Sequence, residues 1–559
     1  MNINKNYRFL LPLMVTAAMP FGAFAANYSA GVIDRQVPDV GVPRGSSLDD
    51  AQQSPVNKEI TPKSVQDPNA KLAKFDAVSF EGNTKISDHV LQEIAEPYLH
   101  RVITKGELAE LKYKLTKVYY DKGYILVKVT TPPQKVQNGT LKVNVYEAEV
   151  GNVIIDDPDN VVRHRIPEQM AKRVSPGEIV KEKTLESMIS DINSLNNVGA
   201  TLNLQPGSEF KTTDLHVALR REKEDVQRVT IDNYGSELTG DIVGTLHLEK
   251  SNLLKLGERF TADIRQSNEQ LTSGKIGLET PIGIRNVILE TSYLASTNDI
   301  GDRLAALDAS GKTHAFNVAL SSAFVDTIPQ KIVGRVGLES REHKSYLAGI
   351  LDTDDNIDRV YLNTTYLARL EKTVWYASAT LSKGLDAFGA SSKGDPLNSR
   401  ALGEPEALRF EPLLLVNYRP WDNGTFKFVG TGQLSTNTLL SSDMFVIGGY
   451  GNVRGFEPAQ ESGENGYQVT FEYDHDFRVH PKLLLRAGPF FDMAGVLNRV
   501  QGSALDDHLY SAGLGAEARA SLFRFGETFA RVDWAHPLGG YHSNEVDDDS
   551  FYFQLGQTF

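Results

Sequence analysis

The sequence predicts a membrane β-barrel of roughly sixteen antiparallel strands, preceded by two small α/β domains and by an N-terminal helix and linker. Three observations support this fold class. From residue 226 to residue 559 the helical period is absent, and short alternating runs recur between clusters of Gly, Asn, Asp and Ser. Two tandem segments of similar layout, residues 75–148 and 150–221, come before them. The chain also begins like an exported protein.

The first 25 residues have the features of a signal peptide. Lys5 and Arg8 precede an apolar stretch at residues 9–18, and an Ala-x-Ala cleavage site follows at residues 23–25. A membrane anchor is the alternative, but the stretch is too short to span a bilayer as a helix. The chain carries a net charge of −14 and no cysteine. These values argue against a nucleic-acid partner and exclude disulfides and thiolate chemistry.

Residues 26–71 are predicted to form a short helix and a linker. Residues 29–36 are weakly amphipathic, and Pro38 would end a helix there. A frayed N-terminus is an open alternative for so short a segment. The linker at residues 38–71 would reach about 110 Å when extended, at about 3.3 Å per residue. This reach would allow the helix to plug a barrel, but it does not establish a plug.

The first α/β domain is expected at residues 72–149. Val78 and Phe80 alternate in its first strand, and Thr104 with Glu107 fits a capping box at the start of a helix. A later strand carries Leu141, Val143 and Val145 on one face.

The second α/β domain is expected at residues 150–223 and repeats this layout. One helix is predicted at residues 166–174, where Pro167 is tolerated in the first turn. A second helix carries apolar residues from Leu185 to Leu195, and Gly199 is predicted to end it. Strands are expected at residues 200–204 and 214–220.

The barrel is expected at residues 224–559, and its last strand is the clearest. Phe551, Phe553 and Leu555 fall on one face, and Tyr552 and Gln554 fall on the other, as in a strand with an apolar lipid side and a polar lumen side. A soluble β-sandwich would give the same alternation, but its strands are shorter and its edges need protection. The acidic run at residues 352–355 is interpreted as a solvated hairpin tip.

A glycine-rich segment at residues 445–456 carries Arg454 on a narrow hairpin. Arg454 is permanently charged, so an enclosed tip needs a carboxylate to pair with it. Asp492 is a lone acid in an apolar run at residues 490–495 and is the candidate partner. No catalytic, cofactor or metal site is predicted, since neither H-E-x-x-H nor G-x-S-x-G occurs.

Several motifs, in order along nearly the whole mature chain, resemble those of the outer-membrane translocators of two-partner (type Vb) secretion. This is the TpsB family, similar to FhaC, ShlB and CdiB, within the superfamily of POTRA-bearing outer-membrane barrels. The motifs are Phe80-Glu81-Gly82-Asn83, Val118-Tyr119-Tyr120-Asp121-Lys122-Gly123-Tyr124, Leu204-Gln205-Pro206-Gly207, Ile231-Asp232-Asn233-Tyr234-Gly235, Val453-Arg454-Gly455-Phe456 and Phe491-Asp492-Met493-Ala494-Gly495.

The resemblance implies an outer-membrane location with two POTRA domains in the periplasm and export of a large, unfolded partner exoprotein through the barrel, without enzyme activity. It also implies partners in membrane lipid and in the barrel assembly machinery, through the C-terminal strand. The cargo stays open among a haemolysin, an adhesin, a contact-dependent toxin and a haem-scavenging protein. A barrel insertase of the same superfamily and a diffusion porin are the alternatives. Tandem POTRA domains argue against the porin.

For the site, the resemblance implies that the hairpin folds back into the lumen. Arg454 would pair with Asp492 on the barrel wall, and Val453 and Phe456 would pack the tip. Gly455 belongs to the same tip motif, and Gly495 belongs to the wall motif. A purely structural anchor that keeps the barrel closed is the alternative role for the pair.

Overall fold

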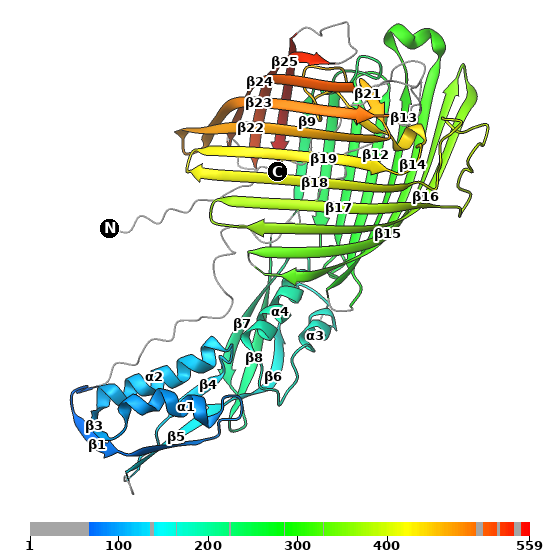
Figure 1. Ribbon diagram of the computed structural model, residues 1–559. Coiled ribbons are helices and arrows are strands. Elements are labelled where there is room, and N and C mark those ends of the chain that lie inside the picture. The colour runs from blue at the N-terminus through cyan, green and yellow to red at the C-terminus, as the bar shows by residue number, and fades with distance from the viewer. Residues whose placement is uncertain are drawn as a thin grey trace. The chain divides into compact units, whose positions relative to one another are not determined.

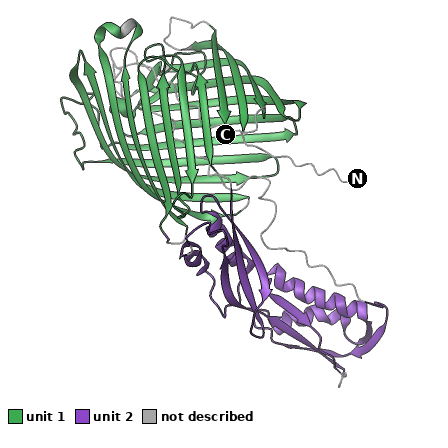
Figure 2. Ribbon diagram, turned by 180° about the vertical axis from the view of Figure 1, so that it is seen from behind, with its two compact units in different colours: residues 1–49, 223–282, 286–559 green, residues 50–222, 283–285 purple. Residues whose placement is uncertain are grey.

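The computed structural model describes residues 66–134, 139–163, 165–222, 225–283, 286–327, 329–498, 507–521, 526–540 and 549–559. The predicted signal peptide, the N-terminal helix and nearly all of the linker lie outside these residues. The chain divides into two compact units, one holding the barrel strands and the other holding the α/β domains (Figures 1 and 2). Among the helices in the described ranges, none has the length and apolar character needed to cross a bilayer.

The first α/β domain is a three-stranded sheet with helices packed on it. The sheet order is β2-β5-β4, in which β2 and β5 are parallel and β4 and β5 are antiparallel. The elements are β1 (Lys71–Phe75), β2 (Ala77–Glu81), α1 (Asp88–Ala95), η3 (Glu96–Tyr98), β3 (Arg101–Thr104), α2 (Lys105–Asp121), β4 (Val127–Thr130) and β5 (Thr140–Glu147). The predicted capping box at Thr104 and Glu107 is confirmed, and Leu141, Val143 and Val145 are buried together as predicted.

Gly82 allows the turn after β2 to pass closely over β5. Its φ is +91°, and an added Cβ would lie 2.4 Å from the carbonyl oxygen of Val145. The turn then brings the backbone N–H groups of Thr84 and Lys85 to the carboxylate of Glu147, at 2.8 and 2.9 Å. The Thr84 hydroxyl donates to the same carboxylate at 2.5 Å. A buried acid at the end of β5 therefore fixes the turn that begins the helical layer.

The second α/β domain has the same sheet arrangement in the order β6-β8-β7. Its elements are β6 (Glu149–Asp156), α3 (Arg165–Ala171), α4 (Glu182–Asn193), β7 (Val198–Pro206) and β8 (Thr212–Arg221). The prediction that Gly199 ends the second helix is wrong, because α4 stops at Asn193 and Gly199 is already paired in β7 with Arg220. The chain turns after Asn193, whose side chain bonds to the backbone of Ala200 on the sheet edge.

Sixteen of the remaining strands close an antiparallel barrel, which confirms the predicted count (Figure 1). The strands are β9 (Val226–Asp232), β10 (Val243–Ser251), β11 (Arg259–Ser267), β12 (Leu271–Pro281), β13 (Val287–Asp299), β14 (Ala309–Asp326), β15 (Gln330–Leu347), β16 (Ile350–Arg369), β17 (Thr373–Leu385), β18 (Leu408–Trp421), β19 (Gly424–Ser435), β22 (Asn465–His480), β23 (Leu483–Leu497), β24 (Asp507–Ala520), β25 (Glu527–Gly540) and β26 (Ser550–Thr558). A short 3-10 helix, η4 (Asp302–Leu307), lies between β13 and β14.

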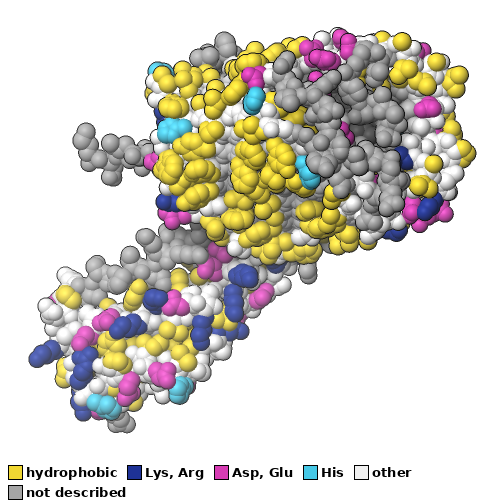
Figure 3. Space-filling view, turned by 45° about the horizontal axis from the view of Figure 1, so that its top comes forward, with side chains coloured by type: hydrophobic (Ala, Val, Ile, Leu, Met, Phe, Trp, Pro, Cys, Tyr) yellow, Lys and Arg dark blue, Asp and Glu magenta, His cyan; other side chains and the backbone are white. Residues whose placement is uncertain are grey.

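Side chains alternate between the outer surface and the lumen along the barrel strands. In β26 the predicted apolar face is confirmed, since Phe551, Phe553 and Leu555 are exposed on the outside. Figure 3 shows such apolar side chains gathered over the barrel wall, as lipid contact requires. Charged residues such as Arg359 and Asp492 are buried instead, on the inner side.

The acidic run at residues 352–355 belongs to strand β16 and not to a hairpin tip, and of its acids Asp352 is exposed whereas Asp355 is buried. The turn before it consists of residues 348–349, between β15 and β16. Asp355 is fully buried and accepts hydrogen bonds from the backbone and hydroxyl of Ser399 and from the hydroxyl of Ser442. Three donors replace the water that a loop tip would have provided.

We predict that Glu147→Gln destabilises the first α/β domain by about 1–3 kcal/mol, because one amide oxygen cannot accept all three donors. Burial raises the pKa of Glu147, but the bonds from Thr84 and Lys85 outweigh it and hold the pKa below its ordinary value of 4.5. The stabilisation is therefore complete above about pH 4.5 and is lost as the pH falls through the lowered pKa. Hydrogen exchange of residues 139–147 in the full chain measures this. Equal protection in both proteins at neutral pH would contradict it.

Candidate functional site

The candidate site is the long loop at residues 436–464, which joins β19 to β22 and folds back into the lumen. It contains η5 (Ser441–Asp443) and a hairpin of β20 (Phe445–Ile447) and β21 (Glu461–Gly463). Gly448, Gly449 and Gly455 all have positive φ, which lets the backbone turn tightly between these strands. The tip packs into a small apolar cluster shared with the wall, made of Phe445, Ile447, Val453, Phe456, Ala494, Val496 and Leu509. Since the last three belong to β23 and β24, the loop packs directly on the inner wall.

The structure brings the two predicted charged residues together. The Nε of Arg454 lies 2.7 Å from Oδ2 of Asp492, and its Nη2 lies 3.0 Å from Oδ1. The backbone N–H of Arg454 also donates to Oδ2, at 3.2 Å. Both residues are almost completely buried, since 5% of the surface of Arg454 and 1% of the surface of Asp492 is exposed. The paired donors of the guanidinium thus match both carboxylate oxygens in one planar geometry.

Asp492 is not the lone acid that the sequence indicated. Nη1 of Arg454 lies 3.4 Å from Oε2 of Glu472 and 3.6 Å from Oδ1 of Asp533. Arg531 bonds to Asp533 at 2.7 Å and approaches Glu472 at 3.3 Å, and Lys427 contacts Glu472 at 3.1 Å. Arg454 is therefore one member of a lumenal charge network, built from β19, β22, β23 and β25.

Sequence reasoning missed these network residues, although a signal was present. Glu472, Asp474 and Asp476 alternate with aromatic residues, including Phe471 and Tyr473, along β22. In a barrel strand this alternation places all three acids in the lumen. Arg531 and Asp533 have the same two-residue spacing on β25.

An aromatic ring supports the guanidinium from the wall. The Cζ atom of Arg454 lies 3.3 Å from the ring centroid of Phe490, two residues before Asp492. Gly513 on the adjacent strand leaves room for this ring, because an added Cβ there would lie 2.3 Å from Phe490. The ring covers one face of the guanidinium while the carboxylates surround its edge.

The loop tip also contacts the seam where the first and last strands meet. The rings of Tyr450 and Tyr234 stack with centroids 3.5 Å apart, and Tyr552 lies 5.2 Å from Tyr450. The hydroxyl of Tyr552 accepts a hydrogen bond from the backbone N–H of Gly455 at 2.9 Å. Tyr234 follows β9 and Tyr552 lies in β26, so the tip contacts both the first and the last strand of the barrel.

Gly495, which was grouped with the wall motif, lies apart from this contact. It is paired with Tyr467 on β22 and with His508 on β24, and an added Cβ would lie 2.4 Å from the His508 ring. Its alternation with Asp492 puts it on the outer face of β23. The glycine therefore makes space for two rings outside the barrel.

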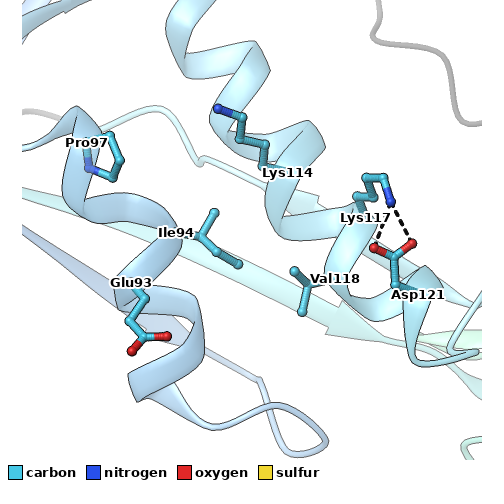
Figure 4. Close-up of a pocket in the computed structure, with 7 residues that line it drawn as sticks. All are labelled: Glu93, Ile94, Pro97, Lys114, Lys117, Val118 and Asp121. Atoms are coloured by element: carbon cyan, nitrogen blue, oxygen red, sulfur yellow. Dashed lines mark hydrogen bonds and ion pairs between the residues drawn. The ribbon is translucent and has the colours of Figure 1, made fainter.

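The first α/β domain has a shallow groove of about 340 Å³ between α1 and α2 (Figure 4). Its lining residues are Glu93, Ile94, Pro97, Lys114, Lys117, Val118 and Asp121. Lys117 donates to both oxygens of Asp121 at 2.7 Å on its rim. The groove lies between two helices and not along a sheet edge.

The chain matches two family models. The model for haemolysin secretion/activation protein ShlB/FhaC/HecB matches residues 211–518, and the model for the ShlB-type POTRA domain matches residues 74–148. The heme/hemopexin transporter protein HuxB of Haemophilus influenzae is 22% identical over 564 residues, which cover 94% of this chain and 93% of HuxB. The outer membrane transporter CdiB of Dickeya dadantii is 22% identical over 405 residues, covering 70% of each chain.

Solved structures with the same fold include a CdiB and a BamA. CdiB from Escherichia coli has a TM-score of 0.69 at 18% identity, covering 89% of this chain and 93% of CdiB. BamA from Haemophilus ducreyi lacking POTRA domains 1–3 has a TM-score of 0.54 at 13% identity, covering 88% and 100%. At these identities the likeness establishes the shared fold.

We predict that Arg454→Ala lowers barrel stability by about 3–5 kcal/mol, because it leaves Asp492 and its neighbouring carboxylates buried without this cation. Arg454→Lys keeps the charge but loses the paired geometry, so its effect is expected to be smaller. Samples of each variant are heated to a series of temperatures before electrophoresis. The temperature at which the folded band shifts to the unfolded position measures the stability of each variant. An unchanged shift temperature for the alanine variant would contradict the prediction.

The network also changes what a charge swap can show. With Arg454→Asp and Asp492→Arg combined, the new acid at 454 would face Glu472 and Asp533. We therefore expect no rescue of stability from the swap, although the wild-type pair is in direct contact.

Proposed function

Because the chain belongs to the haemolysin secretion/activation protein family ShlB/FhaC/HecB, we propose that its long lumenal loop gates the export of an unfolded partner exoprotein. The chain is an outer-membrane two-partner secretion transporter with periplasmic POTRA domains. The observation that carries the proposal is the loop tip, held in the lumen by Arg454. A polypeptide that crosses the barrel needs the space that this loop occupies, so the contact must be broken during transport.

The barrel seam supports passage through the lumen in preference to lateral release into the membrane, as an insertase would require. β26 pairs with β9 from Thr558 and Arg228 to Gln554 and Asp232. The Asn233 side chain then continues the pairing, since its Oδ1 accepts from the N–H of Phe553 at 2.7 Å and its Nδ2 donates to Phe551 at 2.9 Å. A closed seam leaves the two barrel ends as the openings.

We also propose that the exoprotein first binds along the free edge of β7 in the second POTRA domain. The sheet order places β7 at an edge, and alternate residues of an antiparallel strand direct their backbone groups outward. At this edge the backbone N–H and carbonyl of Ala200 are already bonded to the side-chain amide of Asn193. Leu202 and Leu204 come next, and Leu204 continues the apolar face with 39% of its surface exposed. This edge fits the addition of an extended strand.

The first POTRA domain offers less edge for such binding. Its corresponding strand, β4, has four residues, whereas β7 has nine. Leu126 bonds to Ala148 just before β4, so only Val127 and Val129 direct their backbone groups outward. On β7 the bond between Asn193 and Ala200 and the missing N–H of Pro206 leave Leu202 and Leu204, but Leu204 is 39% exposed whereas Val129 is buried. The more exposed edge of the second domain is therefore the proposed receptor.

Further assignments belong to the same proposal. The domain boundaries are residues 1–25, 26–71, 72–149, 150–223 and 224–559, in the order predicted above. Transport proceeds without an enzyme reaction. Membrane lipid covers the outer apolar face, and the barrel assembly machinery engages the last strand, β26. The cargo is one large secreted protein, whose class remains open among those named above.

The export test uses a gene deletion and complementation. We predict that deletion removes one large protein from the surface proteome, and that Arg454→Ala fails to restore it although folded, heat-modifiable barrel is present. The reason is that a tip without Arg454 no longer returns to one defined position on the wall. Export at the wild-type level would reduce the pair to a structural anchor. Loss of many outer-membrane proteins on deletion would instead favour the insertase.

The receptor test uses Leu204→Pro, with Leu204→Ala as the matched control. Proline removes the outward N–H while leaving the β8 pairing intact, so we predict a loss of at least about ten-fold in co-purification of the exported protein. Alanine keeps that N–H and is expected to bind nearly as wild type. A loss with alanine as large as with proline would show that the side chain, and not the strand edge, binds the cargo.

A further inference from the structure

A second buried ion cluster lies at the base of the same loop, well before Arg454 in the sequence. The short helix η5 ends at Asp443, and all three of its residues are buried. Its carboxylate Oδ1 lies 2.7 Å from Nη2 of Arg359 and 2.9 Å from Nη1 of Arg409. Arg359 belongs to β16 and Arg409 to β18. Here the loop provides the anion and the wall provides the cations.

The backbone at this position is tied to the wall as well. The side-chain amide of Gln433 on β19 donates to the carbonyl oxygens of Asp443 and Glu464, both at 3.0 Å. Glu464 is fully buried and accepts from Nη1 of Arg400 at 2.6 Å. One glutamine therefore joins the beginning and the end of the loop, and Arg400 joins that end to the neighbouring loop.

That neighbouring loop, residues 386–407 between β17 and β18, bonds repeatedly to the loop base. The hydroxyl of Ser399 accepts from the backbone N–H of Ser441 at 3.0 Å, and Arg400 donates to the carbonyl of Leu439 at 2.8 Å. The backbone N–H of Glu404 donates to the carbonyl of Thr438 at 2.9 Å. The base is thus held by three strands, β16, β18 and β19, and by a second loop.

We propose that Asp443, with Arg359 and Arg409, is a second and independent clamp that keeps the loop base closed while the tip is released from Asp492. This inference rests on the proposed gating function and goes beyond it. The two clamps use opposite charges on the loop. Asp443 pairs with cations on β16 and β18, whereas Arg454 pairs with acids on β22, β23 and β25. Because they share no residue, loss of one leaves every ion pair of the other in place.

The separation defines which part of the loop moves. When the tip is displaced, the segment from residue 444 to residue 463 turns about a base fixed at both ends by Asp443 and Glu464. The loop at residues 386–407 stays with the base, since its bonds run to residues 438–441. Asp443 is therefore a positioning residue, which acts through the loop and need not touch the cargo.

The test uses single cysteine reporters, which are clean because the chain has no cysteine of its own. Ser441→Cys reports on the base and Val453→Cys on the tip, and both positions are buried. Intact cells that express the full chain without its exoprotein are labelled with a membrane-impermeant maleimide. Asp443→Asn removes the charge but keeps the backbone carbonyl. Asp352→Asn, an exposed acid on the same strand as Arg359, is the matched control.

We expect Asp443→Asn to speed labelling of the base reporter at least ten-fold, since about 1.4 kcal/mol lost from the closed state raises the open population ten-fold. Asp352→Asn should leave that rate unchanged. Arg454→Ala, or Asp492→Asn as a second tip variant, should expose the tip reporter and leave the base reporter protected.

Unchanged base labelling in Asp443→Asn would overturn the proposal. So would base labelling in the tip variants as fast as in Asp443→Asn, because the clamps would then not be independent. If Asp443→Asn gives no folded barrel, Arg409→Gln replaces it. Failure of both to fold, beside a folded Asp352→Asn, also rejects a separate clamp. None of these outcomes depends on export, so failure of the gating function is recognised separately.

Discussion

The interaction on which the site depends is the neutralisation of Arg454 inside the barrel. A guanidinium removed from bulk water is tolerated only where carboxylates surround it. Asp492 supplies two matched oxygens, while Glu472 and Asp533 lie at the other edge of the same group. Charge therefore fixes the tip at one place on the wall, where apolar packing alone would allow neighbouring positions.

Closure of the barrel is the second constraint, because no strand edge can remain unpaired in lipid. Sixteen strands satisfy it in one continuous ladder, and Asn233 extends the seam with its side chain beyond the last backbone pair. Every barrel strand is paired on both sides, so an extended chain can add as a strand only to the sheets of the α/β domains. The division of labour between receptor and pore follows from this backbone requirement.

Much of this architecture was predictable from local patterns. The alternation of Phe551, Phe553 and Leu555 identified a barrel strand, and the Thr104–Glu107 pair located a helix start. Other features depend on contacts far apart in the sequence. Asp355 looked like a loop acid because Ser442, 87 positions away, cannot be recognised as its donor from local sequence. Glu472 and Asp533 differ from Asp355, because their two-residue spacing marked them as lumenal, but only the folded barrel brings β22 and β25 to one cation.

The amide of Asn193 has a consequence for how long a guest strand stays bound. By occupying Ala200 it shortens the accessible part of β7, and Pro206 offers no N–H at the far end. With the receptor role proposed for β7, a bound exoprotein segment forms only a few main-chain bonds between these limits. Such a complex exchanges rapidly, which suits a receptor that must hand each stretch of polypeptide onward. A longer edge would hold its guest too tightly and would also invite pairing between neighbouring copies in the periplasm.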